Sequence, residues 1–179
     1  MGSRQGGDRK IGRRVRVGAR GFSLIELVVT LLLLSVLIGV FLERALYYGE
    51  LAEKSAMEQV SLDVRSSVNL RVAELVLENR FAELRALLSQ NPMDLLEGKP
   101  RNYLGVLKDA DKSSLEPGNW YFDNESKEIV YYVDLGRYFT PDEMGRKRVA
   151  WHVTLVQGAQ PPNVPQWARL ELVKPYQWF

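Results

Sequence analysis

A single carboxylate interrupts a long apolar stretch near the start of the chain. Glu26 is the only charged residue between Phe22 and Leu42. An ionised acid at bilayer depth costs roughly 2.5–3.5 kcal/mol on insertion scales, so such a residue is expected to have a function and a partner. The nearest candidate partner is the amine that cleavage after Gly21 would create on Phe22, four residues before Glu26 and on the same helix face. The alternative is that Glu26 simply reaches the membrane surface near the start of its helix.

The element that must position Glu26 is the apolar stretch 22–42. As a helix, its 21 residues would extend over about 31 Å, close to the hydrocarbon thickness of a bilayer, so the stretch can cross a membrane once. A secretory signal peptide has its small residues after the apolar region, whereas here Gly21 precedes it and Glu43-Arg44 follow it. Any cleavage is therefore expected on the basic side.

The basic charge of the chain is concentrated in residues 1–21. This segment holds seven Lys and Arg residues against one acid, Asp8, while residues 22–179 hold 17 basic and 21 acidic residues. The basic leader predicts that the N-terminus stays cytoplasmic and that residues 43–179 lie across the membrane. The remaining body has a net charge of −4, which argues against a nucleic-acid-binding protein.

The junction between leader and apolar stretch resembles the class III signal of type IV pilins and type II secretion pseudopilins. It reads Gly21-Phe22-Ser23-Leu24-Ile25-Glu26-Leu27. The resemblance implies that a prepilin peptidase cuts after Gly21 and methylates the new amine of Phe22. It also implies that Glu26 supports methylation and pairs with an N-terminal amine in the assembled filament. Other pilins or pseudopilins and an inner-membrane assembly platform are the further partners implied.

The resemblance is dense only over residues 13–45, and the chain departs from many pilins in three ways. The leader is long, no proline lies between residues 22 and 91, and the cysteine pair common in major type IV pilins is missing because the chain has no cysteine. These departures favour a minor pilin or minor pseudopilin over a major adhesive pilin. The absence of cysteine also excludes disulfides and thiolate metal sites.

An amphipathic helix is predicted to continue the apolar stretch to about Leu77. Apolar residues recur there at spacings of three and four, and the acidic and basic residues Glu50, Glu53 and Lys54 are expected on the solvent side, with Glu50 paired to Lys54. The apolar residues are Met57, Val60, Val64, Val68, Val72 and Leu75. We expect this stripe to pack against the chain's own sheet.

Asn79 is a candidate cap for a second helix, which Asn91-Pro92 would end. The apolar residues that would share a face of this helix are Phe81, Leu84, Leu87 and Leu88. The pattern leaves open whether the second helix continues the first or folds back.

Strands follow from about residue 100 onward, where turn residues become frequent. Four are predicted, with a fifth candidate at Tyr103–Leu107: Asn119–Phe122, Glu128–Leu135, Arg148–Val156 and Trp167–Lys174. The predicted fold class is α+β, a long N-terminal helix packed on an antiparallel sheet of about four strands. The expected organisation is a leader (1–21), a membrane part of the helix (22–42), an extracytoplasmic helical region (43–91) and a β-rich globular part (92–179).

Catalytic motifs are not found in this sequence. His152, the only histidine, lies in a predicted strand, and neither a phosphate loop nor a cysteine nucleophile is present, so the chain is not expected to be an enzyme. No metal or cofactor is predicted, although loop acids offer a weak calcium candidate without EF-hand spacing. Those acids are Asp109, Asp111, Glu116, Asp123 and Glu125.

Two further features bear on partners. Arg146-Lys147-Arg148 is the only basic cluster of the body, and beside Asp142-Glu143 it is interpreted as a solvated turn rather than a DNA site. The end of the chain, Tyr176-Gln177-Trp178-Phe179, is unusually aromatic for a terminus, and it is expected either to enter the core or to contact a neighbouring subunit.

The predicted function is that of a structural minor subunit of a type IV pilus or a type II secretion pseudopilus. The chain would be held in the inner membrane by a single span, with its globular part periplasmic or otherwise extracytoplasmic, and would then enter a filament through its N-terminal helix. The alternative is a pilin at a filament tip that binds a ligand such as DNA or a surface.

Overall fold

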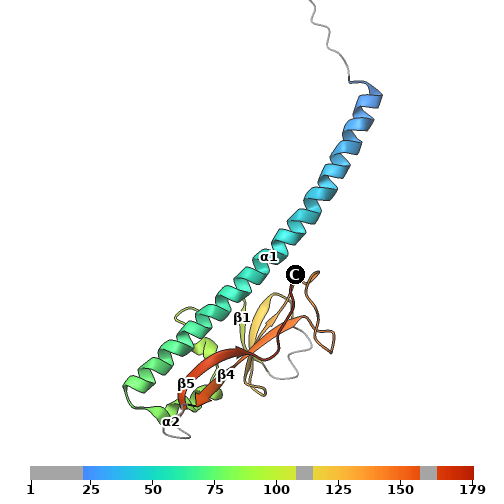
Figure 1. Cartoon of the computed structure of the whole chain (residues 1–179). Helices are drawn as coiled ribbons and strands as arrows, with labels where there is room; N and C mark the ends of the chain where they lie inside the picture. The colour runs from blue at the N-terminus through green and yellow to red at the C-terminus, as the bar shows by residue number, and fades with distance from the viewer. Residues whose placement is uncertain (1–21, 108–114, 158–164) are drawn as a thin grey trace, which may run out of the picture. The chain divides into compact units, whose positions relative to one another are not determined.

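The structure is a computed structural model that describes residues 22–107, 115–157 and 165–179. The chain divides into two compact units, Met1–Glu43 and Arg44–Phe179. The long helix α1 (Leu24–Leu77) begins in the first unit and ends in the second (Figure 1). In the first unit every described side chain is exposed. Among the described residues, α1 is the one helix that is long and apolar enough to cross a membrane, judged by length and composition.

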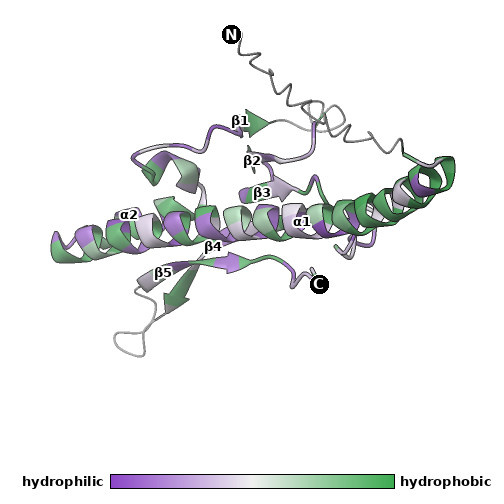
Figure 2. Cartoon of the chain, turned by 90° about the horizontal axis from the view of Figure 1, so that it is seen from above, coloured by the Kyte–Doolittle hydropathy of each residue, from purple (hydrophilic) through white to green (hydrophobic). Residues whose placement is uncertain are grey.

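The apolar stripe predicted for the second part of α1 is buried. Met57, Val64, Val68, Val72 and Leu75 are each at most 1% exposed, and Val60 packs against them. Hydropathy follows this division along α1, since one end of the helix is predominantly hydrophobic while the other end alternates between the two kinds of residue (Figure 2). The prediction of an amphipathic helix is thus confirmed, and its buried side faces the sheet.

In the described part of the chain, five strands form one sheet in the order β1-β2-β3-β4-β5. Their bounds are β1 (Tyr103–Leu107), β2 (Asn119–Asp123), β3 (Glu128–Tyr132), β4 (Arg148–Gln157) and β5 (Pro165–Leu172). The last four strands pair antiparallel, as predicted, but β1 pairs parallel with β2. The fold class is therefore α+β with a mostly antiparallel sheet, and the fifth candidate strand is real but runs in the other sense.

Strand β3 is shorter than predicted, and a helix carboxylate explains why. The predicted strand extended to Leu135, whereas β3 ends at Tyr132. Beyond that point the amides of Asp134 and Leu135 donate to the Glu53 carboxylate of α1, at 2.7 and 2.6 Å, instead of continuing the ladder. Strand β5 likewise ends at Leu172, two residues earlier than expected.

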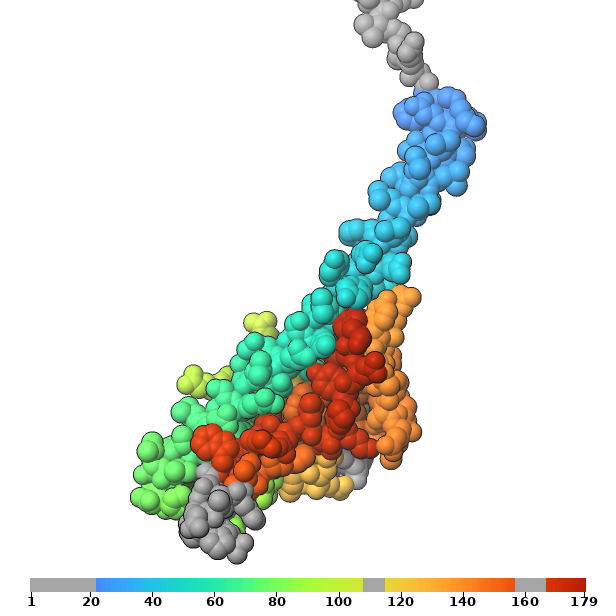
Figure 3. Space-filling model, viewed as in Figure 1, coloured from blue at the N-terminus to red at the C-terminus, as the bar shows by residue number. Residues whose placement is uncertain are grey.

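The core of the second unit lies between α1 and one face of the sheet. Trp120 of β2 stacks near Tyr131 and Trp151 of the next strands, with ring centroids 5.0 and 5.3 Å apart. On β4 the predicted alternation holds, because Val149, Trp151 and Val153 are buried while the residues between them are half-buried. The C-terminal segment joins this core: it lies against α1 (Figure 3), and Trp178 is only 3% exposed.

Asn79 does not cap a second helix; it ends the first. Its φ is +56°, and its amide donates to the carbonyl of Val76 at 3.1 Å while the next amide, that of Arg80, donates to Leu75 at 2.8 Å. This pair of bonds is the Schellman arrangement, in which Asn is one of the few residues that accept the left-handed conformation. The predicted cap was therefore wrong in position.

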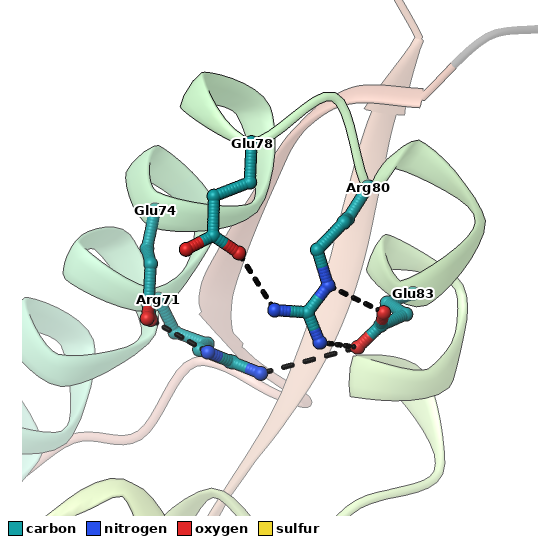
Figure 4. Close-up of polar contacts among 5 residues, drawn as sticks. All are labelled: Arg71, Glu74, Glu78, Arg80 and Glu83. Atoms are coloured by element: carbon teal, nitrogen blue, oxygen red, sulfur yellow. Dashed lines mark hydrogen bonds and ion pairs between the residues drawn. The ribbon is translucent and has the colours of Figure 1, made fainter.

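The second helix is broken into short pieces that leave α1 and pack on the sheet. They are α2 (Phe81–Leu84), next to β5, and η1 (Ala86–Leu88), next to β4, followed by η2 (Pro92–Leu95), which Asn91 caps. A guanidinium network spans the turn between α1 and α2, because Arg80 binds both Glu78 and Glu83 while Arg71 binds Glu74 (Figure 4). These exposed pairs add specificity to the turn more than stability.

Candidate functional site

The start of α1 sets the geometry of the predicted processing site. Phe22 and Ser23 precede the helix, and the Ser23 carbonyl accepts the amide of Leu27 at 3.0 Å, so Ser23 occupies the N-cap position. Gly21 and the leader 1–21 lie outside the described residues. The predicted cleavage site therefore lies at the boundary of the described structure, just before a helix whose first turn is regular.

Glu26 lies in that first turn, as the third helical residue. Its side chain is exposed in the single chain, and its carbonyl accepts the hydroxyl of Thr30 at 2.7 Å. A carboxylate at this position is favoured by the positive end of the helix dipole, by about 0.3–1 kcal/mol at an exposed site. The spacing Ser23-x-x-Glu26 is the sequence pattern of a capping box, a signal in the sequence that the interpretation above did not use.

The part of α1 in the unit Arg44–Phe179 also has a second uncharged face, which the sequence pattern contains but the predictions did not include. Uncharged residues recur at spacings of three and four on the side of α1 opposite the buried stripe. This outer stripe consists of Leu51, Ser55, Gln59, Leu62, Ser66, Leu70, Ala73 and Leu77. Its four leucines are 38%, 53%, 73% and 83% exposed in chain order. Helices that only cover a sheet normally place charged residues there, so an outer stripe of this composition is typical of a helix with two packing faces.

Acidic residues of α1 were expected in solvent, but two of them turn inward. Glu50 is 2% exposed, and its Oε1 accepts the Trp178 indole N–H and the Tyr138 amide, both at 2.8 Å. Glu53 accepts the Tyr131 hydroxyl at 2.9 Å in addition to the two loop amides described above. Burial, followed by the nearby Glu53 charge, raises the pKa of the Tyr131 phenol above its usual range. These carboxylates anchor the β3–β4 loop and the C-terminus to α1.

The predicted pairing of Glu50 with Lys54 was wrong for the same reason. The Lys54 ammonium donates to the Trp178 carbonyl at 3.2 Å and lies 3.9 Å from Glu58. It also lies 5.8 Å from the ring centre of Phe179. Of the two expectations for the aromatic C-terminus, entry into the core therefore holds for Trp178, while Phe179 stays 41% exposed.

The basic cluster forms part of a self-paired loop. The Nε–H groups of Arg146 and Arg148 both donate to Asp142 Oδ2 at 3.2 Å, beside a cleft of about 520 Å³. Burial alone would raise the pKa of the Asp142 carboxyl, but hydrogen bonds from the Arg146 and Met144 amides and from Arg148 lower it below its usual range. Two of the three basic side chains are thus engaged with the loop's own acid.

The calcium candidates are only partly described. Asp109 and Asp111 lie outside the described residues, and Asp123 accepts the amide of Glu125 at 3.0 Å. Among the residues that the structure does describe, no three His, Cys, Asp or Glu side chains gather closely enough to hold a metal ion. The expectation that the chain needs no metal, and the weak calcium candidate beside it, therefore both stay untested. His152 is half-buried on β4, in register with Glu128 and Glu171 of the flanking strands.

Comparison with known families identifies one segment of the chain. Residues 16–42 match the family model described as the prokaryotic N-terminal methylation motif. The match includes Gly21, Phe22 and Glu26 together with most of the apolar stretch. Searches of curated proteins and of solved structures found no match to the chain.

Proposed function

We propose that this type IV pilin-like chain is a minor structural subunit of a type IV pilus or of a type II secretion pseudopilus. The methylation motif at residues 16–42 carries the proposal, because the match includes the end of the basic leader together with Gly21, Phe22 and Glu26. In this proposal a prepilin peptidase removes residues 1–21 and methylates the amine of Phe22. The apolar part of α1 then holds the chain in the inner membrane, with the unit Arg44–Phe179 in the periplasm or outside the cell.

The start of α1 supports a role for Glu26 in assembly. Cleavage after Gly21 leaves the new amine on Phe22, one residue before the N-cap Ser23. The amine would thus lie at the helix end whose dipole favours the Glu26 carboxylate. In a filament the carboxylate would meet an amine offered by another subunit, and a buried acid is tolerable only when such a cation satisfies it. The pair would then set the axial register between subunits, as a buried polar residue does in a coiled coil.

The outer stripe of α1 supports assembly through the helix beyond the membrane. Its exposed leucines and small residues allow a second helix to approach closely, and none of its positions carries a charge that would have to be desolvated. A subunit that packs only through its membrane span would have no need of this surface. We therefore propose that neighbouring pilin-like helices cover the outer stripe in the filament.

Mass spectrometry of the N-terminus tests the processing step. The chain should be isolated from cells that contain a prepilin peptidase, and we expect it to begin at methylated Phe22. Replacing Gly21 by a bulky residue should leave the leader attached, whereas replacing Gly39, which lies in the same apolar stretch with no atom near its missing Cβ, should not. An intact leader in the unaltered chain would contradict the proposal.

Incorporation into filaments tests the role of Glu26. Glu26→Gln removes the charge but keeps the size, and we expect it to reduce incorporation strongly while the protein stays in the membrane. Glu43→Gln is the matched control, because Glu43 is an exposed acid of the same helix that lies outside the family match. Equal incorporation of the Glu26 and Glu43 variants would refute the register role.

The alternative of a ligand-binding tip pilin has less support. Arg146 and Arg148 share one acceptor, Asp142, so the basic cluster presents less free charge than the sequence suggested. Binding of duplex DNA by the extracytoplasmic unit, with an affinity that falls steeply with salt, would favour this alternative.

A further inference from the structure

Four aromatic side chains gather at the N-terminal end of the second unit, where its part of α1 begins. Tyr47 is at the centre, with its ring 5.2 Å from Phe179, 5.6 Å from Tyr48 and 5.9 Å from Tyr138. Tyr138 and Phe179 are themselves 5.4 Å apart. We call these four residues the aromatic cluster; it unites α1, the β3–β4 loop and the chain's last residue.

This cluster is presented to the surroundings rather than buried. Tyr48 is 62% exposed, Phe179 41% and Tyr138 40%. By contrast, the neighbouring Trp178 is a core residue: it is 3% exposed, and its indole N–H donates to Glu50. Exposed side chains of this size are costly to leave in water when they adjoin one another, so their grouping points to a partner.

Cations lie beside the aromatic rings. The guanidinium of Arg137 is 5.7 Å from the centre of the Tyr138 ring, and the Lys54 ammonium is 5.8 Å from that of Phe179. Arg44 is exposed on α1, one turn before Tyr47. Acids also lie nearby: Glu43 is exposed one turn before Tyr47, the buried Glu50 accepts the Tyr138 amide, and Glu58 lies 3.9 Å from Lys54. Tyrosine rings with flanking Lys and Arg are the composition that proteins place at the boundary between lipid headgroups and hydrocarbon.

The cluster also lies close to the apolar stretch along α1, as expected for residues at a membrane surface. Tyr47 follows Leu42, the last residue of the apolar stretch, by five residues of the unbroken helix α1, which corresponds to about 8 Å. The headgroup layer on each side of a bilayer is roughly 5–8 Å deep. If Leu42 marks the end of the hydrocarbon region, Tyr47 and Tyr48 lie at the outer edge of the headgroups.

We propose that the aromatic cluster docks on the phospholipid headgroup layer of the membrane that holds the chain before assembly. This inference rests on the proposed function, because it requires the apolar stretch to span that membrane. The rings insert among the headgroups, and Arg44, exposed one turn before Tyr47, meets lipid phosphates. Docking holds the extracytoplasmic unit against the membrane surface, and extraction into a filament then has to break this contact.

Site-directed labelling tests the inference cleanly because the chain has no cysteine of its own. The full chain is reconstituted, at low protein density, into vesicles of phosphatidylethanolamine and phosphatidylglycerol. An environment-sensitive fluorophore is attached to Arg137→Cys next to the cluster, to Leu77→Cys at the far end of α1, or to Leu33→Cys in the apolar stretch. Nitroxide quenchers are placed either on lipid headgroups or deep in the acyl chains.

We expect headgroup nitroxides to quench the label at 137 but not the label at 77, and deep nitroxides to quench the label at 33. Replacing Tyr48 and Phe179 by serine in the Arg137→Cys chain should abolish quenching of the label at 137. The same two replacements in the Leu33→Cys chain should leave quenching of the label at 33 unchanged. Both residues are substantially exposed, so the fold should survive, which circular dichroism can verify.

The outcomes separate this inference from the proposed function. Quenching at 33 without quenching at 137 would overturn the docking of the cluster and leave the membrane span intact. Loss of deep quenching at 33 would overturn the span and the docking together. Shielding of the label at 137 that appears only at high protein density would show that a second chain, not lipid, covers the cluster, and would also overturn the inference.

Discussion

Replacing Trp178 by alanine should destabilise the unit Arg44–Phe179 far more than an exposed position next to Phe179 would suggest. The indole is 3% exposed and lies edge-on to Phe139, with ring centroids 5.2 Å apart. Truncation of a buried tryptophan to alanine costs about 3–5 kcal/mol through lost burial and the cavity left behind. Because Glu50 also loses its indole donor, we expect a further loss of about 1–3 kcal/mol.

The two contributions can be separated with a second substitution. Trp178→Phe keeps most of the apolar volume but removes the N–H group, so its cost should be about 1–3 kcal/mol, set mainly by the buried Glu50 carboxylate. Glu50→Gln in the same background closes a double-mutant cycle, and contacting residues of this kind couple by about 0.5–3 kcal/mol. Trp167→Ala is the matched control, because Trp167 is 44% exposed and should lose much less.

The assay is urea unfolding of residues 44–179, which hold all the buried residues of the core, followed by far-UV circular dichroism. Stabilities of small domains are about 5–15 kcal/mol, so the expected loss for Trp178→Ala could unfold the unit outright, and Trp178→Phe keeps the measurement possible. A midpoint for Trp178→Ala equal to that of Trp167→Ala would refute the reasoning, since the C-terminus would then not belong to the core.

Three smaller perturbations test other parts of the fold. Burial and Glu53 raise the pKa of Tyr131 above its usual value of 10, and burial raises that of Tyr176 to about 12. The contribution of these two phenols to the unfolding free energy should therefore be constant below pH 10 and be lost above it, and Tyr131→Phe should reduce this alkaline loss in a pH series of urea titrations. Asn79→Ala should destabilise by roughly 1 kcal/mol because its φ is +56°, whereas Asn79→Gly should be neutral or stabilising, as thermal melts can show. Arg80→Ala should change the melting temperature little and only at low salt, because its ion pairs are exposed.

Local patterns in the sequence predicted the elements whose structure depends on neighbours along the chain. The buried residues of α1 repeat every three or four positions, and those of β4 every two, so each pattern identifies both the element and its inner face. The methylation motif is similarly local, which is why Phe22 and Glu26 could be singled out without a structure. Ser23 belonged to the same local signal and could have been read as the helix start.

The contacts that the sequence could not reveal join residues far apart in the chain. Glu53 binds groups 78 to 82 residues away, and Glu50 binds Trp178 at a separation of 128 residues. Glu50 and Glu53 precede Met57 by seven and four residues, so the helical period places both on the face of the buried stripe. Their charge favoured solvent, and only the fold shows which groups they meet on that face. The parallel pairing of β1 is a similar case, because strand direction depends on the path of the whole connection and not on the residues of the strand.

The outer stripe of α1 has consequences for the order of assembly. Fully burying a leucine that was exposed contributes about 1.5–3 kcal/mol, and the four leucines of the stripe are already partly covered, so their contact yields on the order of 4–8 kcal/mol. Association of two free molecules costs an estimated 4–15 kcal/mol, which this gain does not clearly exceed. Two copies of the unit Arg44–Phe179 should therefore not pair in solution through the stripe alone. In the proposed function, confinement of the chains in one membrane raises their effective concentration, and the charge pairing proposed for Glu26 adds a second contact along the same helix. The stripe would then align subunits that the N-terminal part of α1 has already brought together. The proposed function therefore predicts that processing and membrane insertion precede packing of the second part of α1.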